Sequence, residues 1–321
     1  METTHDVIVI GAGPAGLTAA IYLGRARMRT LVVDSGTIGG QMVLTYSVAN
    51  YPGVLEATGA QIAGVMRRQA EAFGAKIIGQ ADIKIVDLKG PTKVIEIEDE
   101  GVFSAPAVII ATGGIPRTLG LPSEEKFKGR GISFCATCDG DFFAGQDIVV
   151  IGGGNSALEE SLSLAKVVNS ITIVHEFDHF QAQPWVVEQV RANPKVKFLL
   201  EQDVREFVGD DTLKEVVSVH KRTGQVSRIP ATGAFIFIGY VPNTKAFAGI
   251  VEMNEKGEIV SDERMRTSRE GVFVAGDARQ KPYRQITTAV GDGTVAALSA
   301  IEYVTNLARS AKGPGRDDRP A

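Results

Sequence analysis

The chain has 321 residues, with 34 basic and 38 acidic side chains, 36 glycines and 2 cysteines. At roughly 150 residues per domain, this length predicts about two domains, each large enough for its own core, and excludes small disulfide scaffolds. The net charge of -4 provides no positive electrostatic field that would attract nucleic acid. The sequence contains no run of about 18 apolar residues, so no transmembrane helix is predicted. Because the polar segment Met1–Asp6 lacks the features of a signal peptide, we expect a cytoplasmic protein.

The first motif is a glycine-rich turn between an apolar strand and a helix. Residues 6–10 (DVIVI) predict a buried strand, G-A-G-P-A-G follows, and a second apolar strand over 31–33 ends at an acid. The first glycine allows the tight turn, the second lets the backbone approach a pyrophosphate, and the third lets the helix pack on the sheet. This register predicts a dinucleotide site rather than a tight turn without a ligand. Its expected residues are Gly11, Gly13, Pro14, Ala15, Gly16 and Asp34.

The same pattern recurs near the middle of the chain. Residues 147–151 predict a second buried strand, a G-G-G-N-S-A turn opens a helix that we expect to reach about Val168, and residues 171–174 predict the next strand. The spacing is that of a βαβ unit. Since one such unit normally holds one dinucleotide, two units suggest a flavoprotein that passes electrons between two bound cofactors. The residues expected at the second turn are Gly152, Gly153, Gly154, Asn155, Ser156 and Glu159.

The two cysteines, Cys135 and Cys138, have C-x-x-C spacing, which places both thiols on one turn. A zinc site with four sulfur ligands would need a second pair, and no His-x-x-x-His motif or carboxylate pair suggests another metal. We therefore expect no metal site. A redox-active pair and two buried thiols that merely lie close together are both consistent with the spacing.

Two further apolar strands end in glycine turns. Residues 107–113 (AVIIATG) and 271–277 (GVFVAGD) share this pattern, and the last two residues of the second can place an amide and a carboxylate beside a ribityl chain or phosphate. The alternative for Asp277 is a simple helix N-cap. Residues 289–307 predict a long amphipathic helix. The charged, Gly- and Pro-rich residues 309–321 predict a mobile tail.

Several stretches resemble the low-molecular-weight bacterial thioredoxin reductases. They are residues 119–143, which contain the cysteine pair, and 151–160, 276–293, 39–41 and 50–53. The resemblance covers nearly the whole chain and implies an α/β fold with two Rossmann-like dinucleotide-binding domains, the second inserted into the first.

The resemblance also implies domain limits and a cofactor. It gives an FAD-binding domain over 1–117 and 245–308, an inserted domain over 118–244 that carries the C-x-x-C motif, and a homodimer. The further FAD ligands that it implies are Gly39, Gly40, Gln41, Asn50, Thr112, Gly113, Gly276, Asp277, Arg284, Gln285 and Ile286.

By the same resemblance, Cys138 faces the isoalloxazine ring, Cys135 exchanges with the disulfide of a thioredoxin-like partner, and Asp139 is the acid/base. An acidified C-x-x-C thiol is both a nucleophile and a leaving group in disulfide exchange. For Asp139, an aspartate at a helix start is the plain alternative. Because one dithiol cannot touch the flavin and a partner at once, we expect the inserted domain to rotate about linkers near 113–114 and 241–243.

The chain departs from this family after the strand at 171–174. There, NADPH-using thioredoxin reductases read His-Arg-Arg with another Arg shortly after, and those cations hold the 2′-phosphate. This chain reads H-E-F-D-H-F-Q-A-Q over 175–183. A Glu in place of a clamping Arg turns attraction into repulsion. The loss of every expected arginine argues against NADPH.

Three interpretations of the second site are open. In the first, Glu176 binds a ribose 2′-OH, as in NAD-specific Rossmann sites and in the NADH-linked flavoprotein of alkyl hydroperoxide reductase, whose Glu-Phe it resembles. In the second, electrons come from a second FAD or a ferredoxin-like donor, and aromatic rings stack on adenine or isoalloxazine. In the third, the aromatics are core and the acid is a solvated surface residue. The strand-end residues concerned are His175, Glu176, Phe177, Phe180 and Trp185.

We rank the second FAD or ferredoxin-like donor first and NADH next. The leading prediction is therefore an FAD-dependent thiol/disulfide oxidoreductase that is not driven by NADPH. An NADH- or NADPH-dependent thioredoxin reductase is the alternative. A flavin redox sensor without turnover is the alternative of another class, but a sensor needs neither the full C-x-x-C spacing nor the neighbouring Asp139.

Overall fold

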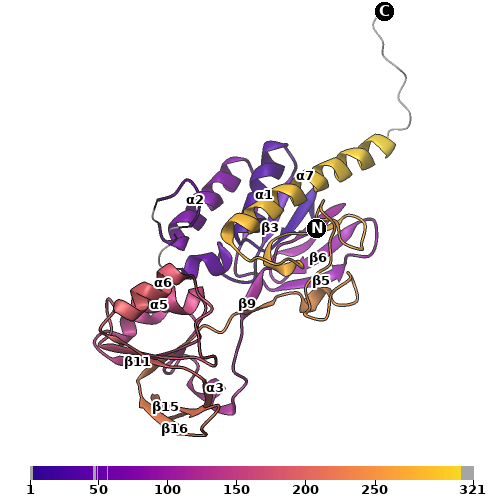
Figure 1. The fold of residues 1–321 in the computed structure, drawn as a ribbon. Coiled ribbons are helices and arrows are strands. Elements are labelled where there is room, and N and C mark those ends of the chain that lie inside the picture. Colours follow the sequence, from indigo (N-terminus) through magenta and orange to yellow (C-terminus); the bar gives the residue numbers. More distant parts are fainter. Residues whose placement is uncertain (1–2, 46–47, 49, 56, 312–321) are drawn as a thin grey trace, which may run out of the picture. The chain divides into compact units, whose positions relative to one another are not determined.

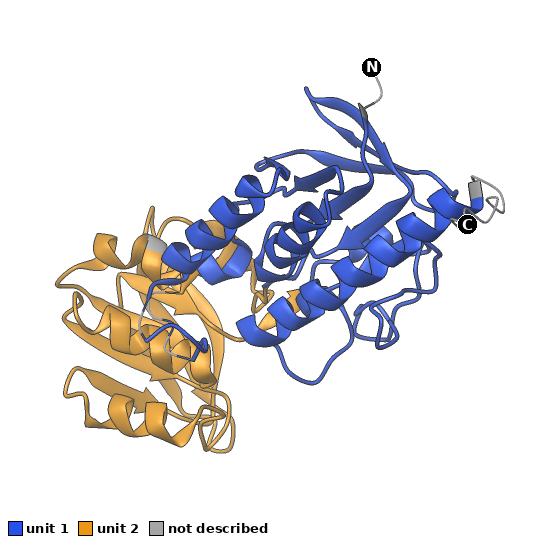
Figure 2. Ribbon diagram, turned by 90° about the horizontal axis from the view of Figure 1, so that it is seen from above, with its two compact units in different colours: residues 1–43, 48–115, 242–321 blue, residues 44–47, 116–241 orange. Residues whose placement is uncertain are grey.

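The computed structural model describes residues 3–45, 48, 50–55 and 57–311 and divides into two compact units (Figures 1 and 2). Unit 1 comprises Met1–Val43, Val48–Ile115 and Pro242–Ala321. Unit 2 comprises Leu44–Ser47 and Pro116–Val241. The chain therefore leaves unit 1 after Ile115 and returns to it at Pro242.

Unit 1 contains a five-stranded parallel sheet. In spatial order its strands are β19 (Val272–Val274), β8 (Ala107–Ile110), β2 (Val7–Ile10), β3 (Thr30–Val33) and β4 (Lys76–Ile78). All but β4 are buried along their whole length, as expected for apolar, β-branched strands in a parallel sheet covered on both faces. The carboxyl ends of these strands share one edge, which is where ligands of such sheets bind.

The helices that pack in unit 1 are α1 (Pro14–Arg25), α2 (Gly59–Ala72) and α7 (Ile286–Ala311), and α1 contacts both of the others. Figure 1 shows the yellow α7 running past α1. The long C-terminal helix was predicted to end at Leu307 and a mobile tail to follow, but residues 309–311 are helical because the first helix breakers come only at Gly313 and Pro314. Residues 312–321 of that tail lie outside the described residues. Within the described ranges, no helix has the length and apolar character needed to cross a bilayer.

A second sheet of unit 1 has four strands. They are β1 (Thr3–Thr4), β7 (Gly101–Ala105), β6 (Lys93–Ile97) and β5 (Ile83–Asp87). Burial alternates along β6, as in a sheet with one face on the core. Its buried Ile95 and Ile97 pack in the same cluster as Ile8 of β2, so the two sheets of unit 1 share a core.

Unit 2 repeats the arrangement of the parallel sheet. In spatial order the strands are β10 (Ile132–Ser133), β17 (Gly233–Ile236), β11 (Asp147–Ile151), β12 (Ser170–Val174) and β13 (Val196–Leu199). As in unit 1, the strand before the glycine turn is central, the next two strands lie on one side of it, and a later strand lies on the other. The duplication read from the sequence is therefore present in the fold, and the expected α/β class with two Rossmann-like domains is confirmed.

The rest of unit 2 comprises short helices and a three-stranded antiparallel sheet. The helices are α3 (Pro122–Phe127), α4 (Ala136–Asp139), α5 (Asn155–Leu164) and α6 (Pro184–Ala192), and the strands are β14 (Gln202–Gly209), β15 (Leu213–His220) and β16 (Val226–Pro230). The helix predicted to reach Val168 ends at Leu164. Beyond it the chain turns toward β12, and Lys195 Nζ satisfies the freed carbonyls of Ala165 at 2.8 Å and Val168 at 2.7 Å.

The two connections between the units pair with each other. They form a two-stranded sheet of β9 (Gly114–Pro116) and β18 (Tyr240–Pro242). The boundaries between the units fall within these strands, next to the glycines and the proline where linkers were predicted.

The contact between α1 and α7 can be tested at one glycine. A Cβ on Gly293 would come within 2.2 Å of the Ala15 carbonyl oxygen, so Gly293→Ala should lower the free energy of unfolding by about 2 kcal/mol, the usual cost of overpacking. Urea unfolding measures it. Gly291→Ala, in the same helix but with nothing within 4 Å of its Cβ, should be neutral or stabilising. Equal losses in both variants would contradict the packing assigned to Gly293.

Candidate cofactor and dithiol sites

The glycine turn of unit 1 lies where three parallel strands end. Gly11 has φ +110°, and a Cβ there would come within 2.2 Å of the Ala111 carbonyl oxygen, just after β8. A Cβ on Gly16 would come within 1.8 Å of the Gly11 carbonyl oxygen. Both positions therefore require glycine for close backbone approach. Gly13 differs, because a Cβ there would meet only the Cα of Gly40, at 3.9 Å. The side of the turn at Gly13 is consequently open.

The first turn of α1 has amide groups available for an anion. Its N-cap, Gly13, makes no side-chain capping hydrogen bond, and Pro14 occupies the first helical position. By contrast, α2 has a complete capping box, in which the Thr58 and Gln61 side chains and backbones are mutually bonded. Uncapped N–H groups at a helix start, with their dipoles aligned, attract phosphate.

Asp34 at the end of β3 is held against this turn. Its Oδ2 accepts a hydrogen bond from the Ala12 N–H at 2.5 Å, and its Oδ1 accepts one from the Gly36 N–H at 2.7 Å. The side chain is half-buried. The acid predicted to bind a ribose therefore lies directly beside the predicted phosphate-binding turn.

Most of the other residues predicted for this site lie around the same edge of the sheet. The Gly39 N–H donates to the Ala12 carbonyl at 2.8 Å, and Asn50 Nδ2 donates to Gln285 Oε1 at 3.3 Å across 235 residues of sequence. Gly40 and Gln41 open the short 3-10 helix η1 (Gly40–Leu44). Thr112 is engaged otherwise, because its hydroxyl donates to the Asn243 carbonyl at 2.6 Å. Gly113, which follows it, has φ +61°.

Residues 276–286 reach the site from the end of β19. Gly276 has φ +74°, and a Cβ there would come within 2.9 Å of the Ala15 Cβ, so the short helix η4 (Gly276–Ala278) packs directly on α1. Asp277 is not the N-cap of η4, and no side chain caps that helix, which removes the capping alternative. Arg284 forms an ion pair with the buried Glu258, so its guanidinium is committed within unit 1. Ile286 begins α7.

The glycine turn of unit 2 repeats this geometry. Gly152 has φ +133°, and a Cβ there would come within 2.2 Å of the Phe237 carbonyl oxygen. Gly154, the N-cap of α5, makes no side-chain capping bond, and a Cβ on it would meet nothing within 4 Å. The Asn155 side chain accepts from the Gln183 N–H at 2.7 Å and so fixes the loop that follows the strand end. Unit 2 therefore also presents an open, uncapped helix start, with Ser156 in its first turn.

His175 is packed against this turn. Its ring would lie 2.5 Å from a Cβ on Gly153, and the residue is 5% exposed. Its Nε2 atom is buried without a hydrogen-bond partner in the part of the chain that the structure describes. Burial lowers the pKa of His175, opposed in part by a backbone hydrogen bond at His179 and the charge of Glu176. On α5, burial raises the pKa of Glu159. Both groups therefore favour their neutral forms more than exposed counterparts would.

Side chains of both charges meet at the end of β12. The Glu176 carboxylate lies 3.8 Å from Lys221 Nζ, and the same ammonium lies 5.6 Å from the centre of the Phe177 ring. Next to this pair, Arg222 is bonded to Glu201 at 3.2 Å. Two cations of the turn between β15 and β16 thus accompany the acid that replaces the expected arginine.

The three aromatic residues predicted for this site have different surroundings. Phe180 is partly buried against the core of unit 2, where it stacks on His175 at 5.9 Å and meets Phe198 edge-on at 5.5 Å. Phe177 meets His175 edge-on at 5.3 Å. Trp185, at the start of α6, is 63% exposed. The aromatic residues do not form one stacking surface among the described ring contacts.

The cysteine motif follows β10, with Cys135 just before α4 and Cys138 within it. The Ser133 hydroxyl donates to Asp139 Oδ2 at 2.6 Å and accepts from the Cys135 N–H at 3.0 Å. Cys135 is disulfide-bonded. The side chain of Cys138 lies outside the described part of the structure. Asp139 ends α4 and occupies the N-cap position of the short 3-10 helix η2 (Gly140–Phe143), although its side chain makes no capping hydrogen bond there. The helix-start alternative for Asp139 therefore stays open beside the acid/base role.

Sequence reasoning missed Ser133, Lys221 and Arg222. Ser133 is only two residues before Cys135, and its 4% exposure is the property that marks it, because a buried hydroxyl needs polar partners. Lys221 and Arg222 lie 45 or more residues after Glu176 in sequence, and only the pairing of β15 with β16 brings their turn to the strand end. The available signal was a basic pair directly before the turn residues Thr223 and Gly224.

The chain matches known proteins over almost its whole length. The sequence model of the family described as pyridine nucleotide-disulphide oxidoreductase matches residues 5–293. A thioredoxin reductase of Peptoclostridium acidaminophilum is 42% identical over 311 residues, which cover 95% of this chain and 98% of the relative.

Solved structures agree with the sequence relatives. The crystal structure of Lactococcus lactis thioredoxin reductase in its FR conformation is 40% identical and gives a TM-score of 0.91, covering 94% of this chain and 100% of its own. The thioredoxin reductase of T. acidophilum is 33% identical with a TM-score of 0.88, covering 95% and 99% of the two chains.

The burial of His175 predicts a pH dependence of stability. Because the pKa of His175 is lowered in the folded state, the unfolded chain binds more protons below about pH 6.5, and the stability contributed by the neutral ring is lost as the pH falls. The free energy of unfolding should therefore drop less between about pH 7 and pH 5.5 in His175→Gln than in the unsubstituted protein. Urea unfolding at both pH values measures it.

His179→Gln serves as the control, because the His179 side chain is 70% exposed and its ion-pair partner Asp178 is also exposed. This variant should keep nearly the full drop. If both histidine variants show the same pH dependence as the unsubstituted protein, the assignment to His175 is wrong.

Proposed function

The chain belongs to the pyridine nucleotide-disulphide oxidoreductase family, and we propose that it uses FAD to carry electrons from NADH to the disulfide of a thioredoxin-like partner. The thioredoxin reductases among its relatives make it a flavin-dependent disulfide oxidoreductase. The donor, the partner and the residue roles are our proposal. In it, unit 1 binds FAD, and unit 2 carries the nicotinamide site and the dithiol.

The turn in unit 1 fits the pyrophosphate and adenosine ribose of FAD. Its support is the open side of Gly13, the uncapped start of α1 and the Asp34 carboxylate fixed beside them. Amides would hold the pyrophosphate and Asp34 a ribose hydroxyl. When bound, FAD supplies a carrier that accepts two electrons and delivers them to a disulfide.

At the cysteine motif, we propose that Cys135 exchanges with the disulfide of the partner protein and that Cys138 faces the flavin. Reduction of a disulfide to two thiols consumes two electrons and two protons, and the new thiol pair then exchanges with the partner disulfide through a mixed disulfide. Asp139 is the group that holds and delivers a proton. Its support is the Ser133 hydroxyl, which fixes the carboxylate at 2.6 Å and the Cys135 amide at 3.0 Å.

The observation that carries the donor proposal is the charge at the end of β12. Glu176 with Lys221, and Glu201 with Arg222, are oppositely charged pairs, so these four side chains sum to zero. A 2′-phosphate carries about -1.5 to -2 charge at neutral pH and would gain no net attraction there. A free ribose diol can instead donate hydrogen bonds to Glu176. NADH fits this site better than NADPH.

A second FAD, like NADH, has an adenosine ribose without a 2′-phosphate, but fewer observations support it as the electron donor. Phe180 is partly buried against the core and already stacks on His175, whereas Trp185 is 63% exposed and has no ring contact among the described residues. These two side chains therefore offer no preformed stacking surface for a second isoalloxazine ring. We therefore place NADH ahead of the second flavin and of the ferredoxin-like donor.

NADPH is the second candidate because of Lys221 and Arg222. Their side chains are 40% and 76% exposed, and exposed ion pairs contribute little free energy. Both cations can exchange their carboxylates for a phosphate. The turn between β15 and β16 would then replace the arginines that are missing from the strand end.

A charge reversal at Glu176 separates these donors. NADH should bleach the flavin of the purified holoenzyme under anaerobic conditions faster than equimolar NADPH. In Glu176→Arg the preference should move toward NADPH by about tenfold or more, because the arginine pairs with the 2′-phosphate and no longer accepts from the ribose. Stopped-flow absorbance of the flavin measures both rates.

Glu206→Arg is the matched control, because it makes the same change of charge at an exposed position of β14. It should leave the preference unchanged. Faster bleaching by NADPH in the unsubstituted protein would favour the second candidate, and no bleaching by either nucleotide would favour the second flavin or ferredoxin-like donor.

The dithiol assignment has its own test. Cys138→Ser should abolish turnover of a thioredoxin disulfide, because Cys135 alone cannot form the intramolecular disulfide that ends each cycle. Bleaching of the flavin by its donor should persist in this variant, which separates the two half-reactions. Unchanged disulfide turnover in Cys138→Ser would show that the motif is not the redox-active pair.

A further inference from the structure

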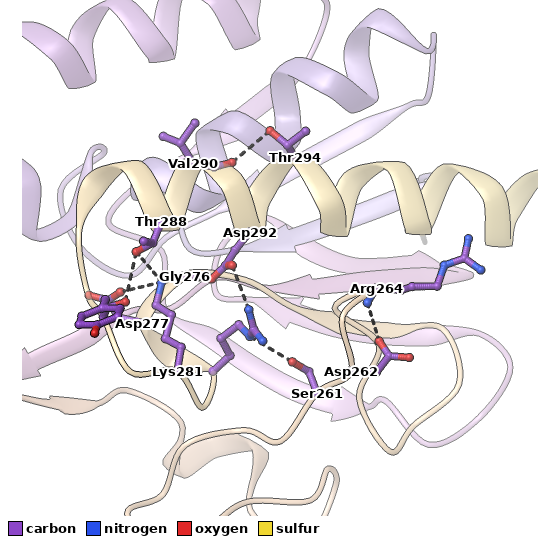
Figure 3. Close-up of polar contacts among 12 residues, drawn as sticks. Ser261, Asp262, Arg264, Gly276, Asp277, Lys281, Thr288, Val290, Asp292 and Thr294 are labelled. Carbon is purple, nitrogen blue, oxygen red and sulfur yellow. Dashed lines mark hydrogen bonds and ion pairs between the residues drawn. The ribbon is translucent and has the colours of Figure 1, made fainter. Parts of the chain in front are cut away.

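A buried group of charges lies beneath the start of α7 in unit 1. We name it the Lys281 cluster, and Figure 3 shows most of its members on the loop and on the helix above it. Lys281 Nζ lies 3.1 Å from Asp292 Oδ2, 3.3 Å from Asp277 Oδ1 and 3.2 Å from the Thr288 hydroxyl. Arg279 completes it with a 3.0 Å bond to Asp292 Oδ1.

Asp292 is the fixed centre of the Lys281 cluster. Its carboxylate accepts from Lys281, from Arg279 and from the Gly276 N–H at 3.2 Å. The side chains of Lys281 and Asp292 are only 6% and 11% exposed. Buried charges require partners, because an unpaired one costs several kcal/mol. The two acids and two bases satisfy this requirement and leave the cluster with no net charge.

Asp277 is the exposed member of the cluster. Its Oδ1 atom is buried 3.3 Å from Lys281 Nζ and has no hydrogen-bond partner among the described residues, whereas 37% of the side chain is exposed. The carboxylate therefore turns one oxygen inward to the ammonium and leaves its other edge at the surface. Gly276, next to it, packs on Ala15 of α1, so this surface adjoins the glycine turn of unit 1.

We propose that Lys281 is a positioning residue for cofactor binding, which holds the Asp277 carboxylate in place so that its outer oxygen accepts a hydrogen bond from an FAD hydroxyl. This rests on the proposed role of Asp277 as an FAD ligand. Lys281 is itself held by Asp292 and Thr288 on α7. Lys281 therefore links the Asp277 carboxylate to α7. Its positive charge also offsets the negative charge of Asp277 close to an anionic cofactor.

The consequence is a measurable coupling between Lys281 and Asp277. Lys281→Met should weaken FAD binding by about tenfold, and Asp277→Asn should weaken it by at least as much. In the double variant, Lys281→Met should add little to Asp277→Asn, because Lys281 acts through that carboxylate. The release of FAD on dilution of the purified holoenzyme, followed by flavin fluorescence, gives the dissociation constant and the release rate.

Two controls separate positioning from general damage. Lys281→Arg keeps the charge and should recover most of the affinity. Arg264→Met removes the cation of an exposed ion pair with Glu302, which lies on α7. This variant should leave the affinity for FAD unchanged. If Lys281→Met does not fold, Thr288→Val provides the milder loss, and its effect should likewise vanish in the Asp277→Asn background.

The outcomes distinguish the two proposals. If Asp277→Asn leaves FAD affinity unchanged, the assignment of Asp277 as a ligand fails, and the role of Lys281 fails with it. If Asp277→Asn weakens binding but Lys281→Met does not, only the positioning role is overturned. An effect of Lys281→Met that is equally large with and without Asp277→Asn would also overturn it, since it would indicate a contribution independent of the carboxylate.

Discussion

Both candidate sites depend on the close approach of two backbone segments at the end of a parallel strand. At Gly11 the neighbour is the Ala111 carbonyl after β8, and at Gly152 it is the Phe237 carbonyl after β17. These neighbours are equivalent, because β8 and β17 each pair with the strand that precedes the glycine. A side chain at either position would separate the strand ends. Because glycine has no Cβ, the strand ends can approach each other at these positions. This close approach fixes the edge of the sheet and the direction of the helix that follows.

That constraint determines what the rest of each site can do. It directs an uncapped helix start at the open edge in both units, and aligned backbone N–H groups of this kind attract anions. Differences in chemistry must then come from side chains around the edge. In unit 1 these are Asp34 and Asp277 with its buried ammonium partner. In unit 2 they are the neutral-favouring His175 and the acid Glu176 beside Lys221.

The sequence predicted the features that depend on local pattern. The strands around both glycine turns, the acid at Asp34 and the duplication could all be read, because spacing along the chain fixes them. Ser133, Lys221 and Lys281 could not, because their partners are set by packing: a buried hydroxyl, a hairpin turn and a loop under α7. The aromatic residues after β12 were misleading for the same reason. The sequence grouped Phe180 with Trp185, but Phe180 is partly buried against the core and Trp185 is exposed.

The order of strands has a consequence for how the chain folds. In unit 1 the edge strand β19 pairs with β8 only after the chain has passed through residues 116–241, whereas nearly all of unit 2 is one continuous segment. During synthesis, the segment that forms unit 2 can therefore collapse on its own contacts while the first sheet still lacks its last strand. The helix start at α7, with Asp292 and Lys281, emerges later still. Closing that long loop has an entropic cost, so we expect β19 and α7 to join the first sheet late in folding.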